Sequence, residues 1–222
     1  MTQIPQPGKR FLDLAIAVPA FLLLLPVLAL TAGVVAMGLG RPVIFRQRRP
    51  GLLGEAFEVV KFRSMTDECD ADGNLKTDLE RLTALGKLLR KTSLDELPQL
   101  WNVIKGDMSL VGPRPLLMEY LPNYSAEHQR RHTALPGVTG WAQINGRNDT
   151  MFSARIALDL WYVDHWSIWL DLKILALTAQ RVLNSSGVKH GQTYLDVDDI
   201  GLDSRSHGPA VSSLLPEAVS KE

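Results

Sequence analysis

The sequence predicts a mainly helical α+β protein whose N-terminal segment lies in a membrane. Three observations support this fold class. No charged residue occurs between Leu14 and Leu39, two short β-rich runs lie within residues 43–62, and apolar residues at helical spacing cover 152–164 and 168–183. The short strands and the longer helical segments together indicate a small hairpin within a largely helical domain.

Composition excludes several classes of protein. The chain has 222 residues, a length that fits one domain with accessory segments. Basic and acidic residues balance at 24 each, which argues against a nucleic-acid-binding protein driven by bulk positive charge. A hydrophobic fraction of 45% excludes a wholly disordered chain. The single cysteine, Cys69, excludes an intramolecular disulfide and a multi-cysteine metal site.

The chain divides into three parts. We expect a membrane helix with basic flanks over residues 1–41, a folded domain over 42–191 and an acidic tail over 192–222. The tail has more acidic than basic residues and no sustained periodicity, so we expect it to be mobile.

The apolar segment allows three interpretations. A cleaved signal peptide fits poorly, because the run exceeds the usual length of about 7–15 residues and no A-x-A site follows it. A straight single-pass helix fits the length. A re-entrant helix is favoured by basic residues on both flanks (Lys9 and Arg10 before, Arg41 and Arg46 after), and by Pro26 near the middle, which bends or breaks a helix. On the residues alone the spanning and re-entrant forms are equally compatible.

The remaining elements follow from periodicity and turn signals. In order, we expect a hairpin over 43–62 with a basic turn at 46–54, a polar loop at 65–78, helices at 79–91 and 97–104, a turn-rich loop at 106–115, short helices within 116–133, a glycine-rich loop at 136–148 with a strand at 141–144, and helices at 152–164 and 168–183. Trp161, Trp166 and Trp169 at the start of the last helix suit a membrane interface, although aromatic packing in a buried helix explains them equally well.

The segment from Arg90 to Leu100 carries the strongest candidate site. Ser93 and Glu96 have the spacing of a capping box, which would give both a purely structural role. Pro98 favours Asp95 as the N-cap instead, because Pro98 would then be the third helical residue, where its missing N–H is unimportant. Asp95 would then lie at the helix start next to Glu96. Two adjacent carboxylates preceded by cations could handle a phosphate together with Mg²⁺.

Two further segments carry candidate phosphate-binding residues. Arg114 lies between Pro113 and Pro115, which restrict the backbone and hence the direction of the guanidinium. The loop over 136–148 combines glycines, amides and Arg147, a composition that could hold a nucleotide. A rigid surface turn and an ordinary loop are the structural alternatives.

Taken together, these segments resemble the bacterial sugar transferases, specifically the monotopic, PglC-like phosphoglycosyl transferases. The resemblance extends to about residue 190 and leaves the acidic tail unexplained. The matching segments are Lys9-Arg10 with Asp13, Pro26, Val43-Ile44-Phe45, Gln47, Arg49-Pro50-Gly51, Lys61-Phe62-Arg63-Ser64-Met65, Ser93-Leu94-Asp95-Glu96-Leu97, Gly106-Asp107-Met108-Ser109, Gly112-Pro113-Arg114-Pro115, Pro136 to Asn148, Asp159, Tyr162 and Asp171-Leu172-Lys173.

The resemblance implies a fold and a location. It implies a re-entrant membrane helix broken at Pro26 and a domain seated by interfacial amphipathic helices on the cytoplasmic face of the bacterial inner membrane. The family often has Ser before this proline, whereas this chain has Leu25, which changes the hydrogen bonding available at the break.

The resemblance also implies an activity. A UDP-sugar would donate a phosphosugar to a polyprenyl phosphate such as undecaprenyl phosphate, with UMP released. Asp95 would be the nucleophile and Glu96 the Mg²⁺ ligand. The cations that match are Lys61, Arg90, Arg114 and Arg147, assigned to phosphate contact, and Asp159 is counted with the substrate-binding residues. The alternatives are an inactive membrane-anchored scaffold and a transferase that uses direct displacement without a covalent enzyme.

Overall fold

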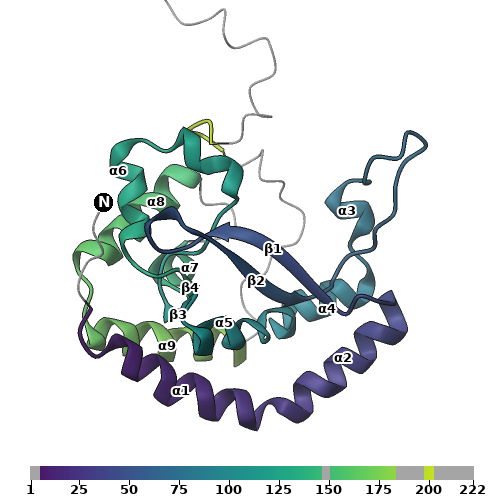
Figure 1. Cartoon of the computed structure of the whole chain (residues 1–222), viewed down its shortest axis with the longest axis horizontal. Helices are drawn as coiled ribbons and strands as arrows, with labels where there is room; N and C mark the ends of the chain where they lie inside the picture. The colour runs from purple at the N-terminus through teal and green to yellow at the C-terminus, as the bar shows by residue number, and fades with distance from the viewer. Residues whose placement is uncertain (1–5, 147–150, 184–197, 203–222) are drawn as a thin grey trace, which may run out of the picture.

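The computed structural model describes residues 6–146, 151–183 and 198–202, which form a mainly helical structure with two small sheets (Figure 1). The elements are α1 (Lys9–Leu23), α2 (Leu25–Leu39), β1 (Ile44–Pro50), η1 (Leu52–Gly54), β2 (Ala56–Phe62), α3 (Asp78–Arg81), α4 (Ala84–Lys91), η2 (Leu94–Glu96), α5 (Gln99–Lys105), β3 (Ser109–Val111), η3 (Met118–Asn123), α6 (Ala126–Gln129), η4 (Arg130–Thr133), β4 (Gly137–Thr139), α7 (Trp141–Asn145), α8 (Phe152–Asp164) and α9 (Ile168–Leu183).

The apolar segment forms a bent helix pair along one edge of the molecule (Figure 1). α1 ends at Leu23, α2 begins at Leu25, and the two axes differ in direction by 59°. Pro26 is the second residue of α2. Its missing N–H is harmless at a helix start but prevents α1 from continuing unbroken. No helix within the described residues is long and apolar enough to cross a membrane by itself. The two helices of the bent pair together have the length and the apolar composition that a membrane segment requires.

Buried polar contacts attach α1 to the rest of the domain. Lys9 Nζ lies 2.5 Å from Asp171 Oδ2 in α9 and 3.1 Å from the hydroxyl of Tyr162 in α8. Asp13 Oδ1 accepts hydrogen bonds from Ser109 Oγ at 2.9 Å and from the Leu110 N–H at 3.0 Å. Removing one partner of a buried ion pair costs roughly 3–5 kcal/mol. These contacts therefore fix how α1 lies on α9 and β3.

The outer surface of the helix pair is strongly apolar. Phe11, Leu23 and Met37 have exposed fractions of 80%, 80% and 82%. Val35 on the inner side of α2 is fully buried against a cluster that includes Phe62. Large exposed apolar side chains in such number indicate a surface that contacts another apolar phase or partner.

The first sheet is the predicted antiparallel hairpin of β1 and β2. Its register places Ile44 opposite Phe62 and Pro50 opposite Ala56. The expected basic turn over 46–54 is too long, because β1 continues to Pro50. Arg46 and Arg48 are exposed two residues apart, a spacing that is compatible with a strand whose one face is solvated. The turn is confined to residues 51–55.

The second sheet differs from the prediction. β3 and β4 pair in parallel, with Ser109 opposite Gly137, and the expected strand at 141–144 is instead the helix α7. A Cβ added at Gly137 would lie 2.0 Å from the Gly112 N, so glycine permits this close backbone approach. The glycine-rich loop therefore builds a strand pairing that local propensity does not reveal.

The predicted helix over 79–91 is divided into α3 and α4. Thr77 caps α3 in a capping box with Glu80, and the Thr83 hydroxyl accepts a hydrogen bond from the Gly86 N–H at the start of α4. Each hydroxyl satisfies a backbone N–H that lacks an intrahelical partner. The predicted helices over 152–164 and 168–183 are confirmed as α8 and α9.

Part of the acidic tail packs against the domain. Leu202 is fully buried in a cluster with Tyr120 and Phe152, and its carbonyl accepts a hydrogen bond from Asn123 Nδ2 at 2.8 Å. Asp199 Oδ1 accepts from the Ser153 N–H at 3.0 Å. The expectation of a mobile tail is therefore wrong for residues 198–202, because Leu202 completes an apolar cluster.

Candidate active site

The two adjacent carboxylates lie in a tight turn between α4 and α5. Asp95 and Glu96 belong to the 3₁₀ turn η2, which follows Ser93 with a left-handed φ of 56°. Pro98, not Asp95, occupies the N-cap of α5, and the Ser93 side chain makes no capping hydrogen bond. Neither capping arrangement considered from the sequence forms. The turn instead directs the carboxylates independently of a helix end.

Glu96 is held between two cations. Its Oε1 lies 2.6 Å from Arg114 Nη2 and 3.3 Å from Lys61 Nζ. Burial by itself would raise the pKa of Glu96, but the positive charges of Arg114 and Lys61 outweigh burial and lower it to about 2. Glu96 is therefore an anion throughout the physiological range, a property suited to binding a cation.

Asp95 has a different environment from Glu96. It is 7% exposed, and burial raises the pKa of its carboxyl, with the neighbouring charge of Glu96 acting in the same direction. The charges of Lys61, Arg90 and Arg114 act in the opposite direction without reversing the shift. A desolvated carboxylate with a raised pKa is more basic than a hydrated one, and this favours a nucleophilic role.

Arg90 approaches the site from the C-terminal end of α4. Its Nε donates to Ser64 Oγ at 3.1 Å. Gly86 allows α4 to pack this closely, because a Cβ at that position would lie 1.8 Å from the Ser64 carbonyl oxygen. The structure therefore brings together five of the predicted residues around one turn, namely Asp95, Glu96, Lys61, Arg90 and Arg114.

The raised pKa of Asp95 predicts the acidic side of the pH–activity profile. Activity should fall in acid with a midpoint above the ordinary aspartate value of 3.8, because the nucleophilic role expected of Asp95 requires its ionised form. Arg90→Gln removes a charge that favours ionisation, so the pKa of Asp95 rises and the midpoint moves to higher pH. Profiles of kcat/KM against pH test this. Lys91→Gln, which removes an exposed charge from the same end of α4, is the matched control, and an equal movement in both variants would contradict the assignment.

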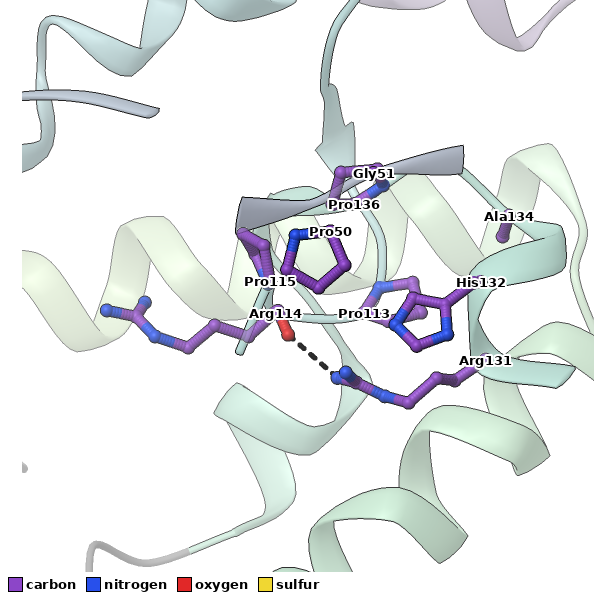
Figure 2. Close-up of a pocket in the computed structure, with 9 residues that line it drawn as sticks. All are labelled: Pro50, Gly51, Pro113, Arg114, Pro115, Arg131, His132, Ala134 and Pro136. Carbon is purple, nitrogen blue, oxygen red and sulfur yellow. Dashed lines mark hydrogen bonds between the residues drawn. The ribbon is translucent and has the colours of Figure 1, made fainter. Parts of the chain in front are cut away.

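Arg114 reaches the carboxylates from a proline-rich turn. Figure 2 shows its side chain directed away from a small cavity that Pro50, Pro113 and Pro115 border. The cavity volume is about 10 Å³, whereas ligand pockets span roughly 300–1,000 Å³. This cavity is too small for a nucleotide, and the Arg114 guanidinium lies outside it, 2.6 Å from Glu96 Oε1.

Asp159 does not join this group. It is 3% exposed, and its Oδ2 lies 2.6 Å from Arg131 Nη2. In this structure the Asp159 carboxylate is buried and paired with Arg131, and its contact with a substrate stays a prediction. Arg147, the remaining predicted phosphate ligand, lies outside the described residues.

The carboxylates are compatible with the expected Mg²⁺. Mg²⁺ prefers oxygen ligands and usually combines one or two carboxylates with substrate phosphates and water. Within the described residues, no group of three or more His, Cys, Asp or Glu side chains is arranged so that it could hold a metal ion by itself. Glu96, with Asp95 beside it, fits such a site only if the substrate completes the coordination.

The burial of Arg131 next to this site was not predicted from the sequence. This residue lies in the polar run Arg130-Arg131-His132, a composition typical of an exposed segment, yet Arg131 is only 2% exposed. Its neighbour Arg130 forms an exposed ion pair with Asp164. The alternation of one exposed and one buried arginine depends on packing against α8, which no local signal specifies.

This arrangement defines a class of site. A buried carboxylate beside an ionised, cation-paired carboxylate, with three cations around them, is suited to phosphoryl chemistry. Comparison with known proteins is in agreement, because a family model described as bacterial sugar transferase matches residues 4–185. The chain belongs to the bacterial sugar transferase family.

Individual relatives show how far the similarity extends. The uncharacterized sugar transferase EpsL of Bacillus subtilis is 55% identical over 181 residues, covering 82% of this chain and 90% of EpsL. The undecaprenyl-phosphate glucose phosphotransferase of Komagataeibacter xylinus is 44% identical over 195 residues, covering 80% of this chain and 36% of that protein. The undecaprenyl-phosphate galactose phosphotransferase of Salmonella typhimurium is 43% identical over 166 residues, covering 67% of this chain and 35% of that protein. The chain therefore spans little more than a third of these two larger relatives.

Proposed function

We propose that this protein transfers a sugar 1-phosphate from a UDP-sugar to undecaprenyl phosphate or a similar polyprenyl phosphate. The product would be a polyprenyl diphosphate sugar, formed as the first membrane step in assembling a polysaccharide or glycoconjugate. The observation that carries the proposal is the pair Asp95–Glu96 among Lys61, Arg90 and Arg114, in a chain of the bacterial sugar transferase family. The names of relatives that use undecaprenyl phosphate support the acceptor.

The chemistry we propose proceeds in two displacements. An Asp95 carboxylate oxygen attacks the β-phosphorus of the donor, the bond from that phosphorus to the bridging oxygen breaks, and UMP leaves with the bridging oxygen. A phosphate oxygen of the polyprenyl phosphate then attacks the same phosphorus and releases the Asp95 carboxylate. Each step forms one P–O bond and breaks one, so neither requires a proton at Asp95.

The surrounding cations have distinct tasks in this scheme. Arg114, Lys61 and Arg90 place positive charge next to the phosphoryl oxygens and so lower the repulsion that an anionic nucleophile meets. Glu96 would hold Mg²⁺ beside the nucleophile Asp95. The ion would neutralise charge on the diphosphate and its leaving group.

The apolar surface of α1 and α2 supports attachment to the bacterial inner membrane. We propose that the bent pair enters and leaves the bilayer on the cytoplasmic face, with basic residues such as Arg10 and Arg41 remaining on that side. The acceptor carries its phosphate at the membrane surface and the donor is soluble. A site held at this surface can meet both substrates without extraction of the lipid.

A release assay tests the proposed function. The full chain, in detergent or nanodiscs with undecaprenyl phosphate and Mg²⁺, should release UMP from at least one member of a panel of UDP-sugars and form a lipid-linked product. The panel should include UDP-glucose and UDP-galactose, because the named relatives differ in their sugar. If no UDP-sugar yields UMP while the protein is folded, the proposal fails.

Initial-rate kinetics distinguish the covalent scheme from direct displacement. Double-reciprocal plots at several acceptor concentrations should give parallel lines if UMP leaves before the acceptor reacts. Intersecting lines would favour a ternary complex. A folded protein without turnover would favour the scaffold alternative.

A further inference from the structure

Arg131 is a buried cation with no assigned role that touches the backbone of the active site. Its Nη2 donates to the Arg114 carbonyl oxygen at 2.7 Å, as the dashed line in Figure 2 shows. The same Nη2 lies 2.6 Å from Asp159 Oδ2, which Nε also contacts at 3.1 Å. Nη1 lies 3.4 Å from the Tyr124 hydroxyl. The guanidinium therefore joins η4, α8 and the turn that carries Arg114.

This pair is poorly explained as a source of stability. Burying two charges costs hydration energy for each ion, and replacement by packed apolar residues is often neutral or stabilising. Burial lowers the pKa of neighbouring His132 to about 4, with the charge of Arg131 acting in the same direction, so His132 is neutral at physiological pH. What Arg131 and Asp159 supply that apolar residues would not is a set of directed donors and acceptors.

The hydrogen bond from Arg131 to the Arg114 carbonyl restricts ψ of Arg114, the backbone torsion that the neighbouring prolines do not fix. Pro113 has a fixed φ, and its carbonyl accepts a hydrogen bond from the Gly137 N–H at 3.0 Å. Pro115 restricts the residue before it to extended conformations, but within that region ψ of Arg114 can still vary. The hydrogen bond from Arg131 to the Arg114 carbonyl fixes this torsion. The backbone is therefore fixed both before and after Arg114, and this fixes the direction in which its side chain leaves the main chain.

Arg114 requires such support because its side chain is long and partly exposed. The side chain is 44% exposed and extends to Glu96 Oε1, 2.6 Å from Nη2. An ion pair at one end of a long, partly exposed side chain does not by itself hold that side chain in one geometry. A fixed backbone limits the positions that the guanidinium can reach.

We infer that Arg131, oriented by Asp159, is a positioning residue that aligns Arg114 with Glu96 and the reacting phosphate. It acts through the Arg114 carbonyl and does not touch substrate. The inference rests on the proposed function for its catalytic consequence. The alignment itself is a property of the folded chain.

A double-mutant cycle tests the inference in the active protein. Arg131→Lys keeps the charge next to Asp159 but lacks the planar fork that reaches two acceptors, and we expect kcat/KM to fall by roughly 10- to 100-fold. In an Arg114→Ala background the same substitution should change kcat/KM by less than about 2-fold, because the group that it positions is gone. Equal factors in both backgrounds, or no loss in the first, would overturn the inference. Asp159→Asn, which preserves shape, provides a second cycle if Arg131→Lys folds poorly.

A spectroscopic measurement separates this inference from the proposed function. Nitrogen-15 relaxation of the Arg114 side-chain Nε, assigned from its loss in Arg114→Lys, should show a restricted group in the wild type and a mobile group in Arg131→Lys. This result is expected whether or not UMP release is observed. An unchanged Arg114 signal would overturn the positioning role, whereas a wild-type protein without UMP release would count against the proposed function alone.

Discussion

Asp95→Asn should abolish transfer to the lipid acceptor and release of UMP. The amide has nearly the shape of the carboxylate, but it lacks the anionic oxygen that we propose attacks the β-phosphorus. In other enzymes, removal of a covalent nucleophile lowers kcat by several orders of magnitude, and we expect a loss of at least about 10⁴-fold in kcat here. UMP release under saturating donor and acceptor measures this loss.

The burial of Asp95 makes the fold control important for this variant. Asp95 is 7% exposed, and the substitution also removes a negative charge next to Lys61 and Arg90. Thermal unfolding should therefore be compared with that of the wild type. Asp72→Asn, an exposed carboxylate in the loop before α3, should keep full activity. Turnover by folded Asp95→Asn within about 10-fold of the wild type would exclude Asp95 as the nucleophile.

Glu96→Gln should have the second largest effect, with a loss of at least about 100-fold in kcat/KM. The substitution removes the anion that we propose binds Mg²⁺ and that pairs with Arg114 and Lys61. The concentration of Mg²⁺ that gives half-maximal activity should rise, because a neutral amide is a weaker ligand for a hard cation. Titration of UMP release with Mg²⁺ measures this midpoint.

Arg114→Gln separates the metal role of Glu96 from its ion pairing. Arg114 contacts the Glu96 oxygen that a cation would also require. Loss of Arg114 should lower the rate without raising the Mg²⁺ midpoint. A midpoint that is unchanged in Glu96→Gln would show that Glu96 does not bind the metal.

Long, strongly patterned elements of this fold were predictable from the sequence. α8 and α9 begin and end where the apolar periodicity predicts, and the hairpin of β1 and β2 follows from two short β-rich runs. The break near Pro26 follows from the chemistry of proline. In these cases local propensity and tertiary packing favour the same structure.

The parts that were not predicted depend on contacts between distant segments. The parallel pairing of β3 with β4 requires glycines whose close approach is visible only in three dimensions. The left-handed Ser93 overrides both capping arrangements that spacing suggested.

The candidate site shows the same division. Adjacency, charge and family resemblance predicted a site containing Asp95, Glu96 and three of the cations, and the structure brings these five residues together. The burial of Arg131 and its pairing with Asp159 were not predicted, because burial of a charged residue depends on a partner elsewhere in the chain.

The central claim is that the enzyme itself carries the phosphosugar for part of each cycle. Wild-type protein should be incubated with its UDP-sugar and Mg²⁺ in the absence of polyprenyl phosphate, quenched rapidly and measured by intact mass and peptide mapping. We predict a mass increase of one phosphosugar, located on the peptide that contains Asp95 and lost when acceptor is added. Unmodified protein at every time point, in a preparation that forms lipid-linked product at the full rate once acceptor is present, would contradict the account.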